Sequence, residues 1–235
     1  SIAQLIRDSL LTPLGLDSTF YDVAEPERGT LAHRWWNSVD YHDTARTGLN
    51  SAGGCAGAIF STAGEMCQWY RALFGGDVLQ PASITELTRF VPTTSSVMDY
   101  GLGLDRETTL GLTYWGHGGS TWGYHSKMIY DTCAQAVVCG LSNSFPSGME
   151  AVTYILYRVL VNQVPGCTGA ISGPATVCSK DAAQIYTVPP IPNATDYVWT
   201  LPAGFIGNST TNTIQVYIDT SAVSGTISVH GTNAY

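Results

Sequence analysis

The apolar pattern of the chain changes abruptly across the segment Gln163-Val164-Pro165-Gly166-Cys167-Thr168-Gly169. Before this segment, runs with helical spacing alternate with runs of period two. After it, residues 171–235 are rich in Thr, Val, Ile, Pro and Asn, and no helical period remains. Because Pro and Gly interrupt regular elements, we interpret the segment as a linker. The sequence therefore predicts two domains, at 1–165 and 170–235.

The part before the linker contains several predicted helices. One is expected at the start of the chain and is ended by Pro13 and Gly15. Another begins at Thr62, which forms a capping box with Glu65, and a third covers residues 148–162. Apolar residues that share a helix face usually face the core. In the first helix these are Ile2, Leu5, Ile6 and Leu10, and in the third they are Val152, Ile155, Leu156, Val159 and Leu160.

Strand patterns fill the middle and the end of the chain. Residues 17–50 predict a long loop with short strands, and long loops are often functional. Segments 100–104, 112–115, 124–130 and 134–141 predict successive antiparallel strands. Segments 197–201, 213–217 and 225–229 alternate at period two between turn residues, which is typical of a small β-sandwich. The predicted chain is multidomain, with helices packed on an antiparallel sheet (α+β) followed by an all-β module.

Composition narrows the range of partners. The formal net charge is −8 with only two lysines, Lys127 and Lys180, so nucleic acid is an unsuitable partner. No apolar run reaches the roughly 18 residues that a transmembrane helix needs. None of the six cysteines forms a C-x-x-C pair, so no metal site is expected; they are either disulfides of an oxidising compartment or buried thiols. No cofactor is indicated.

The segment 115–124, WGHGGSTWGY, is a glycine-rich turn between two predicted strands. Glycines let a ligand approach the backbone, and exposed N–H groups beside a carbonyl can form an oxyanion hole. Taken alone, the segment is equally explained by a tight hairpin with an incidental histidine.

Four segments in order resemble the serine β-lactamase and penicillin-binding-protein family, in particular its class C-like branch. They are Leu11 to Thr19 (LTPLGLDST), Ala52 to Gly54 followed by Ser61 to Met66, Tyr100 to Leu104 (YGLGL), and His117 to Gly119. The resemblance spans residues 1 to about 162. It implies a partial β-lactamase/transpeptidase-like domain.

The same resemblance implies the site residues His117, Gly118, Gly119 and Ser120. His117 would line the cleft and orient substrate, and Gly119 would allow close approach of the substrate. The backbone N–H of Ser120 would donate to the oxyanion hole. We hold the other histidines, His33, His42, His125 and His230, to be structural.

Two motifs of the family are absent from this sequence. No serine stands three residues before a lysine, and no Tyr or Ser stands two residues before an asparagine. We expect both motifs, S-x-x-K and Y-x-N, to lie upstream, so the chain is interpreted as an inactive fragment of an acyl-enzyme hydrolase, and whether the chain is itself an enzyme is left open. The expected partner is a small-molecule or peptide acyl substrate, and peptidase, β-lactamase and esterase activities stay open. The alternative is a non-catalytic surface or binding protein.

Residues 171–235 resemble the PKD-like, Ig-fold modules of Bacteroidota surface proteins. The resemblance rests on residues 171–178, 186–189 and 194–202, and it implies that Trp199 is a core residue. It implies a role in spacing or cell-surface attachment, and a secreted, periplasmic or cell-surface location in a bacterium. We further expect His117 to lie at a sheet edge facing an open groove, and the chain alone to expose apolar surface and to associate.

Overall fold

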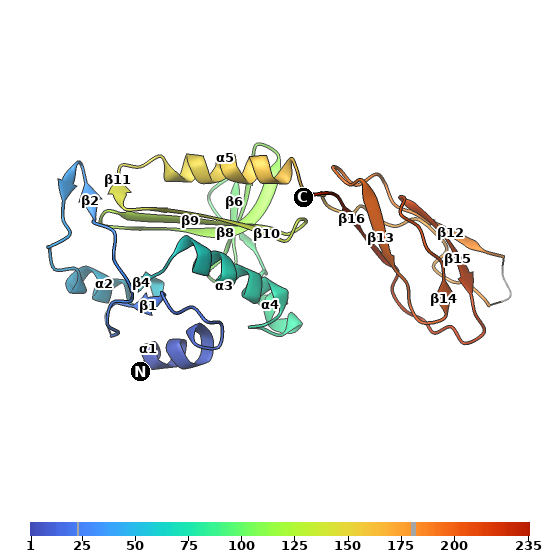
Figure 1. Ribbon diagram of the computed structural model, residues 1–235, viewed down its shortest axis with the longest axis horizontal. Helices are drawn as coiled ribbons and strands as arrows, with labels where there is room; N and C mark the ends of the chain where they lie inside the picture. Colours follow the sequence, from blue (N-terminus) through green and yellow to red (C-terminus); the bar gives the residue numbers. More distant parts are fainter. Residues whose placement is uncertain (23, 180–181) are drawn as a thin grey trace. The chain divides into compact units, whose positions relative to one another are not determined.

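A computed structural model describes residues 1–22, 24–179 and 182–235 (Figure 1). Lys180 lies outside the described residues, as does the side chain of Cys55. The backbone divides into two compact units, Ser1–Tyr157 and Arg158–Tyr235. We describe each unit by itself. The domain limits at 1–165 and 170–235 stay a prediction.

A six-stranded antiparallel sheet forms the centre of the first unit. Its strands follow the order β10-β9-β8-β7-β6-β5. Their bounds are β5 Val91–Pro92, β6 Met98–Tyr100, β7 Asp105–Thr109, β8 Leu112–Thr121, β9 Tyr124–Asp131 and β10 Ala136–Ser142. The predicted strand at 100–104 ends at Tyr100, because Leu102 and Gly103 form a turn in which Gly103 has a φ of 72°.

Helix α3 (Ala63–Gly75) packs on one face of this sheet. Thr62 caps it by accepting the backbone N–H of Glu65, as the capping box predicts. The Glu65 side chain completes a different contact, since it accepts hydrogen bonds from the Ser18 backbone and the Thr19 hydroxyl. The core between helix and sheet contains Tyr70, Leu104, Met128 and Tyr130, with Phe74 stacked on Tyr130 at 4.3 Å.

Helix α5 (Met149–Val161) covers the opposite face, and the prediction of its buried side is wrong. Its buried residues are Thr153 and Tyr157. Gly140 on β10 lets the helix approach, since a Cβ there would lie 1.8 Å from the Thr153 hydroxyl. Tyr157 donates a hydrogen bond to buried Asp131 at 2.7 Å. The face of α5 that packs on the sheet is therefore the one that carries the hydroxyl groups of Thr153 and Tyr157.

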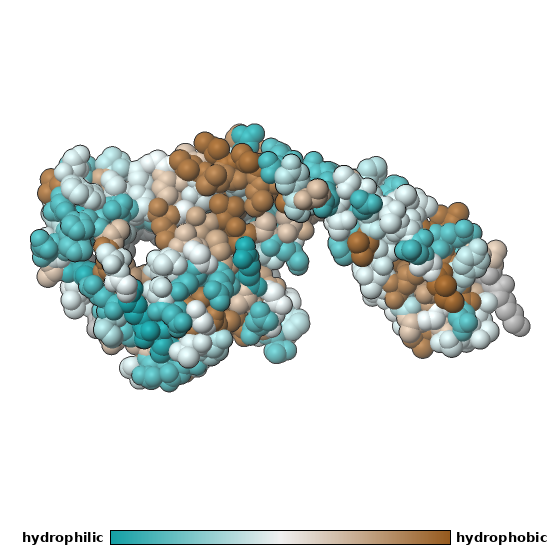
Figure 2. Space-filling view, in the orientation of Figure 1, coloured by the Kyte–Doolittle hydropathy of each residue, from teal (hydrophilic) through white to brown (hydrophobic). Residues whose placement is uncertain are grey.

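The apolar stripe of α5 consequently points outward. Figure 2 shows apolar surface gathered over this helix. The residues of the stripe are Val152, Ile155, Leu156 and Val159, each more than half exposed. We refer to these four residues as the α5 stripe.

Shorter elements complete the first unit. Helix α1 (Ile2–Ile6) continues into a π-helical turn, η1 (Arg7–Leu11), which shifts the helical register. The predicted apolar face is therefore only partly covered: Ile2 and Leu5 are exposed, whereas Ala3 and Leu11 are buried. The other elements are β1 Phe20–Tyr21, β2 Trp35–Trp36, β3 Val39–Asp40, α2 Thr47–Gly53, η2 Gly54–Ala56, β4 Ile59–Phe60, α4 Pro81–Leu87 and β11 Ser144–Phe145.

The second unit is a small all-β module. One sheet has the order β12-β15-β14, and the other pairs β13 with β16. The bounds are β12 Gln184–Thr187, β13 Asp196–Thr200, β14 Phe205–Ile206, β15 Thr213–Ile218 and β16 Ser228–Thr232. Tyr186, Ile214 and Val216 form its buried core, and Trp199 packs against them while donating its Nε1–H to the Thr211 carbonyl at 2.9 Å. Trp199 was expected to be a buried core residue; it packs against the core but is only half-buried.

Four cysteines of the described residues fall into two groups. Cys67 and Cys139 are free thiols between α3 and the sheet, and burial raises the pKa of both. Cys133 and Cys167 are each disulfide-bonded. Both interpretations left open by the sequence thus occur. Within the described residues, no helix is both long enough and apolar enough to cross a membrane.

Candidate functional site

Strand β8 extends beyond its neighbour β7. The β7 pairing stops where Asp105 meets Gly116, whereas the β9 pairing continues to Thr121 opposite Tyr124. In the part of the chain that the structure describes, the segment His117–Thr121 is therefore paired on one side only. Although β8 is an inner strand of the sheet, this half of it has an unpaired side, which we call the open side of β8. His117, Gly119, Ser120 and Thr121 are all exposed.

The β8–β9 turn fixes which amides point toward the open side. Its loop is Trp122–Gly123, so Thr121 and Tyr124 are the closing hydrogen-bonded pair expected of a two-residue hairpin. Hydrogen-bonded and non-hydrogen-bonded pairs alternate along an antiparallel ladder. Ser120 and Gly118 are then non-hydrogen-bonded toward β9, and their N–H groups are directed to the open side. This is the direction that an oxyanion donor at Ser120 requires.

His117 stands at the start of the open side and is held by two contacts. In the ladder it lies opposite Met128, so its side chain is on the α3 face of the sheet. Its Nδ1 lies 2.5 Å from the Gly118 carbonyl oxygen, which can only accept, so Nδ1 carries the hydrogen. In the neutral ring Nε2 then accepts the Tyr100 hydroxyl at 2.7 Å. The tautomer of His117 is thus set by its surroundings.

Tyr100 is the residue that sequence reasoning missed. The sequence placed it in the YGLGL segment without a role. It ends β6, which is separated from β8 by β7, and its hydroxyl reaches across β7 to the His117 ring. The signal that could have found it is the Tyr at the end of a strand just before a Gly-rich turn, but only the strand order reveals the contact.

The glycines of the motif differ in how much space their surroundings leave for a side chain. A Cβ on Gly116 would lie 2.1 Å from the Met128 carbonyl, so a side chain there requires the backbone to move. A Cβ on Gly119 would lie 2.7 Å from the Ser126 hydroxyl, whereas at Gly118 nothing is closer than 3.6 Å. Gly123, with a φ of 87°, abuts Arg34 and Trp35. Gly119 and Ser126 face the same side as His117.

A charged network supports this strand from the other face. Lys127 pairs with Glu107, which also accepts the Tyr114 hydroxyl at 2.8 Å. Burial alone would raise the pKa of Glu107, but hydrogen bonds from Lys127 and Tyr114 lower it below its ordinary value. Burial raises the pKa of Asp105, which is 6% exposed and has one carboxyl oxygen without a hydrogen-bond partner. The network joins β7, β8 and β9 beneath the site.

A cavity of about 340 Å³ lies on the same sheet face as His117. Its wall is mainly apolar, and it includes Ser126 opposite Gly119 and the carboxylate of Glu65. The residues that line it are Ile6, Leu10, Leu11, Leu16, Thr19, Ile59, Ser61, Glu65, Met66, Trp69, Ser126, Met128 and Leu141. Apolar pockets with a few convergent polar groups are the usual form of ligand sites.

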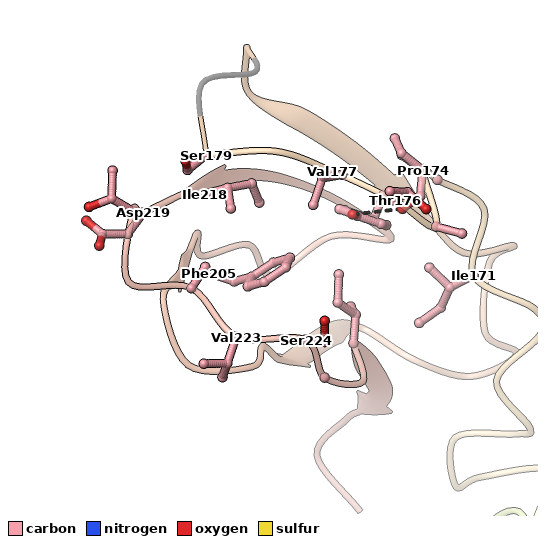
Figure 3. Close-up of a pocket in the computed structure, with 17 residues that line it drawn as sticks. Ile171, Pro174, Thr176, Val177, Ser179, Phe205, Ile218, Asp219, Val223 and Ser224 are labelled. Atoms are coloured by element: carbon pink, nitrogen blue, oxygen red, sulfur yellow. Dashed lines mark hydrogen bonds between the residues drawn. The ribbon is translucent and has the colours of Figure 1, made fainter.

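The second unit has a cavity of about 570 Å³ that is lined by few reactive side chains (Figure 3). Aliphatic residues and Phe205 line it, together with hydroxyl groups and one carboxylate. That carboxylate, Asp219, accepts both the backbone N–H and the hydroxyl of Ser221, which lowers the pKa of Asp219. We interpret this cavity as the mouth of the sandwich core.

The remaining candidate groups do not converge on His117. Among the described residues, no set of three or more His, Cys, Asp or Glu side chains is arranged to hold a metal ion. His33 and His42 stack on each other at 4.0 Å, and His33 binds Asp40. No serine hydroxyl of the described residues hydrogen-bonds to His117. The structure therefore brings together His117, Gly118, Gly119, Ser120 and Tyr100.

Comparison with known proteins agrees with this fold. The family model described as Beta-lactamase matches residues 1–163, and the model described as PKD-like domain matches residues 164–235. The chain belongs to the beta-lactamase family, and a PKD-like domain follows the family's domain. The predicted family and the multidomain fold class are confirmed.

Solved structures show the same fold at low identity. D-stereospecific amidohydrolase from Streptomyces sp. is 21% identical with a TM-score of 0.56, over 65% of this chain and 46% of that one. D-amino acid amidase from Ochrobactrum anthropi SV3, complexed with L-phenylalanine, is 23% identical at 0.57, over 68% and 49%. Penicillin binding protein from Bacillus halodurans is 16% identical at 0.57, over 68% and 50%. The chain spans about half the length of these structures.

Proposed function

We propose that this chain supplies the substrate-binding strand and one oxyanion donor of a serine hydrolase that acts on an acyl group. The observation that carries the proposal is the open side of β8, where the outward N–H of Ser120 lies three residues after an oriented His117. The backbone N–H of Ser120 keeps its position because strand β8 is fixed by its pairing with β9 and by the Lys127–Glu107 network beneath it. Preorganised donors of this kind stabilise the charge that develops on a carbonyl oxygen.

Each residue has a defined part in this proposal. The Ser120 N–H donates to the developing oxyanion, and Gly119, which bears no side chain, leaves room for the substrate beside it. His117, held by Tyr100, lines the cleft and orients the substrate. The nucleophile and its base come from residues outside this sequence, since no S-x-x-K is present. The chain alone is therefore inactive.

We infer that the substrate is an amide of a D-amino acid or a related acyl compound. The neighbours named above include a D-stereospecific amidohydrolase and a D-amino acid amidase. The open side of β8 supports this choice because an amide can pair with a strand edge through both its N–H and its C=O. β-Lactams and esters are the competing classes.

We propose an extracytoplasmic location, with the PKD-like domain as a spacer or surface attachment. Two observations support it: PKD-like domains are consistent with extracellular proteins, and Cys133 and Cys167 are disulfide-bonded.

A non-catalytic role is the second candidate. An unpaired strand side binds an extended peptide by main-chain hydrogen bonds without any chemistry. In that case a longer gene product would bind peptides but would form no covalent acyl-enzyme.

The experiment compares this chain with the longer product encoded by the surrounding reading frame. Both are given a chromogenic cephalosporin, a nitrophenyl ester and D-phenylalanine amide, and covalent labelling is followed by mass spectrometry. We expect turnover and a labelled serine only in the longer product. Ser120→Pro, which removes the outward N–H, should lower kcat about 100-fold, whereas Ser120→Ala, which keeps it, should not. Serine-dependent turnover by the 235-residue chain would refute the proposal.

A further inference from the structure

A run of aromatic rings begins where the open side of β8 ends. Trp122 occupies the first position of the β8–β9 turn, two residues after Ser120. Its ring meets Trp36 edge-on at 6.4 Å and Tyr41 at 5.1 Å. Trp36 stacks in turn on Phe145 at 4.2 Å. β2 and β11, which carry Trp36 and Phe145, lie side by side at this end of the sheet (Figure 1).

The rings are mounted rigidly. Arg34 is 4% exposed and donates to the carbonyls of Tyr41 and Thr44 at 2.8 and 2.7 Å. The Tyr124 hydroxyl donates to the Ala32 carbonyl at 2.7 Å, which ties the β8–β9 turn to the same loop. A ligand that stacks on preorganised rings loses less entropy than one that must order them.

Trp122 is the exposed ring of the run, whereas Trp36 and Tyr41 are half-buried. Trp122 is 38% exposed, although its neighbours cover the rest of it. Asp40, which precedes Tyr41 in the sequence, binds the His33 ring at 2.6 Å and the His42 backbone N–H at 2.8 Å. Such rings offer flat apolar faces and edges on which another aromatic ring can pack, offset-stacked or edge-on.

We propose that Trp122, Trp36 and Tyr41 form a recognition surface for an aromatic side chain of the acyl substrate. This inference rests on the proposed function, because it takes the open side of β8 as the place where the substrate backbone lies. A ligand whose carbonyl meets the Ser120 N–H has its next residue level with Thr121, one position before Trp122, since strands advance roughly 3.3 Å per residue. The surface therefore selects the side chain on the acyl part of the substrate.

The test measures binding to the 235-residue chain, which requires no catalysis. The probes are N-acetyl-phenylalanine amide and N-acetyl-alanine amide, each as the D and L form. Binding is measured by titration, from changes in the chemical shifts of the protein's backbone amides. We expect the phenylalanine probe to bind about fivefold to tenfold more tightly than the alanine probe. Trp122→Ala should abolish that difference.

Trp35→Ala is the matched control. Trp35 is 37% exposed, close to the 38% of Trp122, and precedes Trp36 on the β2–β3 hairpin, yet within the described residues the ring contacts of the run do not include it. It should leave the preference unchanged. The proposal would be overturned by equal affinity for the two probes or by the absence of saturable binding. It would also be overturned if Trp35→Ala lost the preference equally, or if the surface around Trp122 bound an N-acetylglucosamine oligomer more tightly than the phenylalanine probe. Acylation by the longer product tests the proposed function separately, so either can fail without the other.

Discussion

The hydroxyl of Tyr100 lies 2.7 Å from Nε2 of His117, although the two residues belong to strands that are not neighbours in the sheet. The Gly118 carbonyl, which can only accept, places the hydrogen on Nδ1, and Nε2 of the neutral ring then accepts the Tyr100 hydroxyl. The orientation of the His117 ring therefore depends on both contacts, and the Tyr100 hydroxyl is the one that a side-chain substitution can remove.

Removing that hydroxyl should release the His117 ring. In Tyr100→Phe we expect nitrogen-15 spectra of the side chain to show both tautomers instead of one. The loss in unfolding free energy should be about 0.5–1 kcal/mol, since one solvent-accessible hydrogen bond is lost. Tyr124→Phe is the control, because it also loses a 2.7 Å hydrogen bond but makes no contact with His117. An unchanged tautomer in Tyr100→Phe would show that Gly118 alone holds the ring.

Two glycines of the motif should respond differently to the same substitution. Gly116→Ala places a Cβ 2.1 Å from the Met128 carbonyl, and the strand must shift to accept it. We expect a loss of about 2–3 kcal/mol in unfolding free energy. Gly118→Ala meets nothing closer than 3.6 Å and should change stability by less than about 0.5 kcal/mol. Urea unfolding measures both, and equal losses would contradict the register described for β8.

The Lys127–Glu107 pair should make stability depend on acid. The pKa of Glu107 is lowered in the folded state, so its contribution is full above the unfolded value of 4.5 and is lost as the pH falls through the lower folded value. Glu107→Gln should cost about 2–3 kcal/mol at pH 7, because Lys127 is left buried without its partner. The difference between Glu107→Gln and the parent should shrink below pH 4.5. Urea melts from pH 3 to pH 7 measure it, and a constant difference would contradict the pairing.

Ionisation of Asp105 should lower the stability of the fold, whereas ionisation of Glu107 raises it. Burial raises its pKa, so the stability lost on ionisation grows as the pH rises above the unfolded value of 3.8. Asp105→Asn removes that ionisation and should raise the melting temperature at pH 7 but not at pH 3. Equal melting temperatures for the two proteins at pH 7 would show that the carboxylate is already compensated.

The α5 stripe should mediate association of the isolated chain. Four exposed apolar residues on one helix face form the kind of patch that favours contact with another molecule. We expect Ile155→Lys to shift the chain toward the monomer in size-exclusion chromatography without lowering its melting temperature. Tyr157→Phe, which changes a buried neighbour, should lower stability and leave association unchanged. A parent chain that is monomeric at high concentration would remove this expectation.

The sequence predicted what depends on local pattern. The capping residue Thr62, the helix at 148–162 and the β8–β9 hairpin follow from propensities and turn residues, and the structure has them. The sequence-based prediction was wrong at α5. Periodicity identified an apolar stripe there, but it could not show whether the stripe faces the sheet or the exterior. Gly140 and Asp131 decide that question, and both come from other strands.

The same limit applies to the site. The motif predicted His117 and Ser120 in a turn between two strands, whereas the structure places both on β8, which continues to Thr121. The contact with Tyr100 depends on strand order, and the aromatic run joins residues more than 80 positions apart in the sequence. A pattern that covers a few residues contains no information on such pairs.

The two outward amides of β8 belong to Gly118 and Ser120, so they are one dipeptide apart, roughly 7 Å. An extended ligand repeats its own N–H and C=O groups over the same length. It can therefore meet both amides only when its chain is straight and runs in one direction along the strand, whereas a bent ligand can meet one of them at most. Under the proposed function, the spacing of these two N–H groups would therefore favour an extended ligand over a bent one of the same composition.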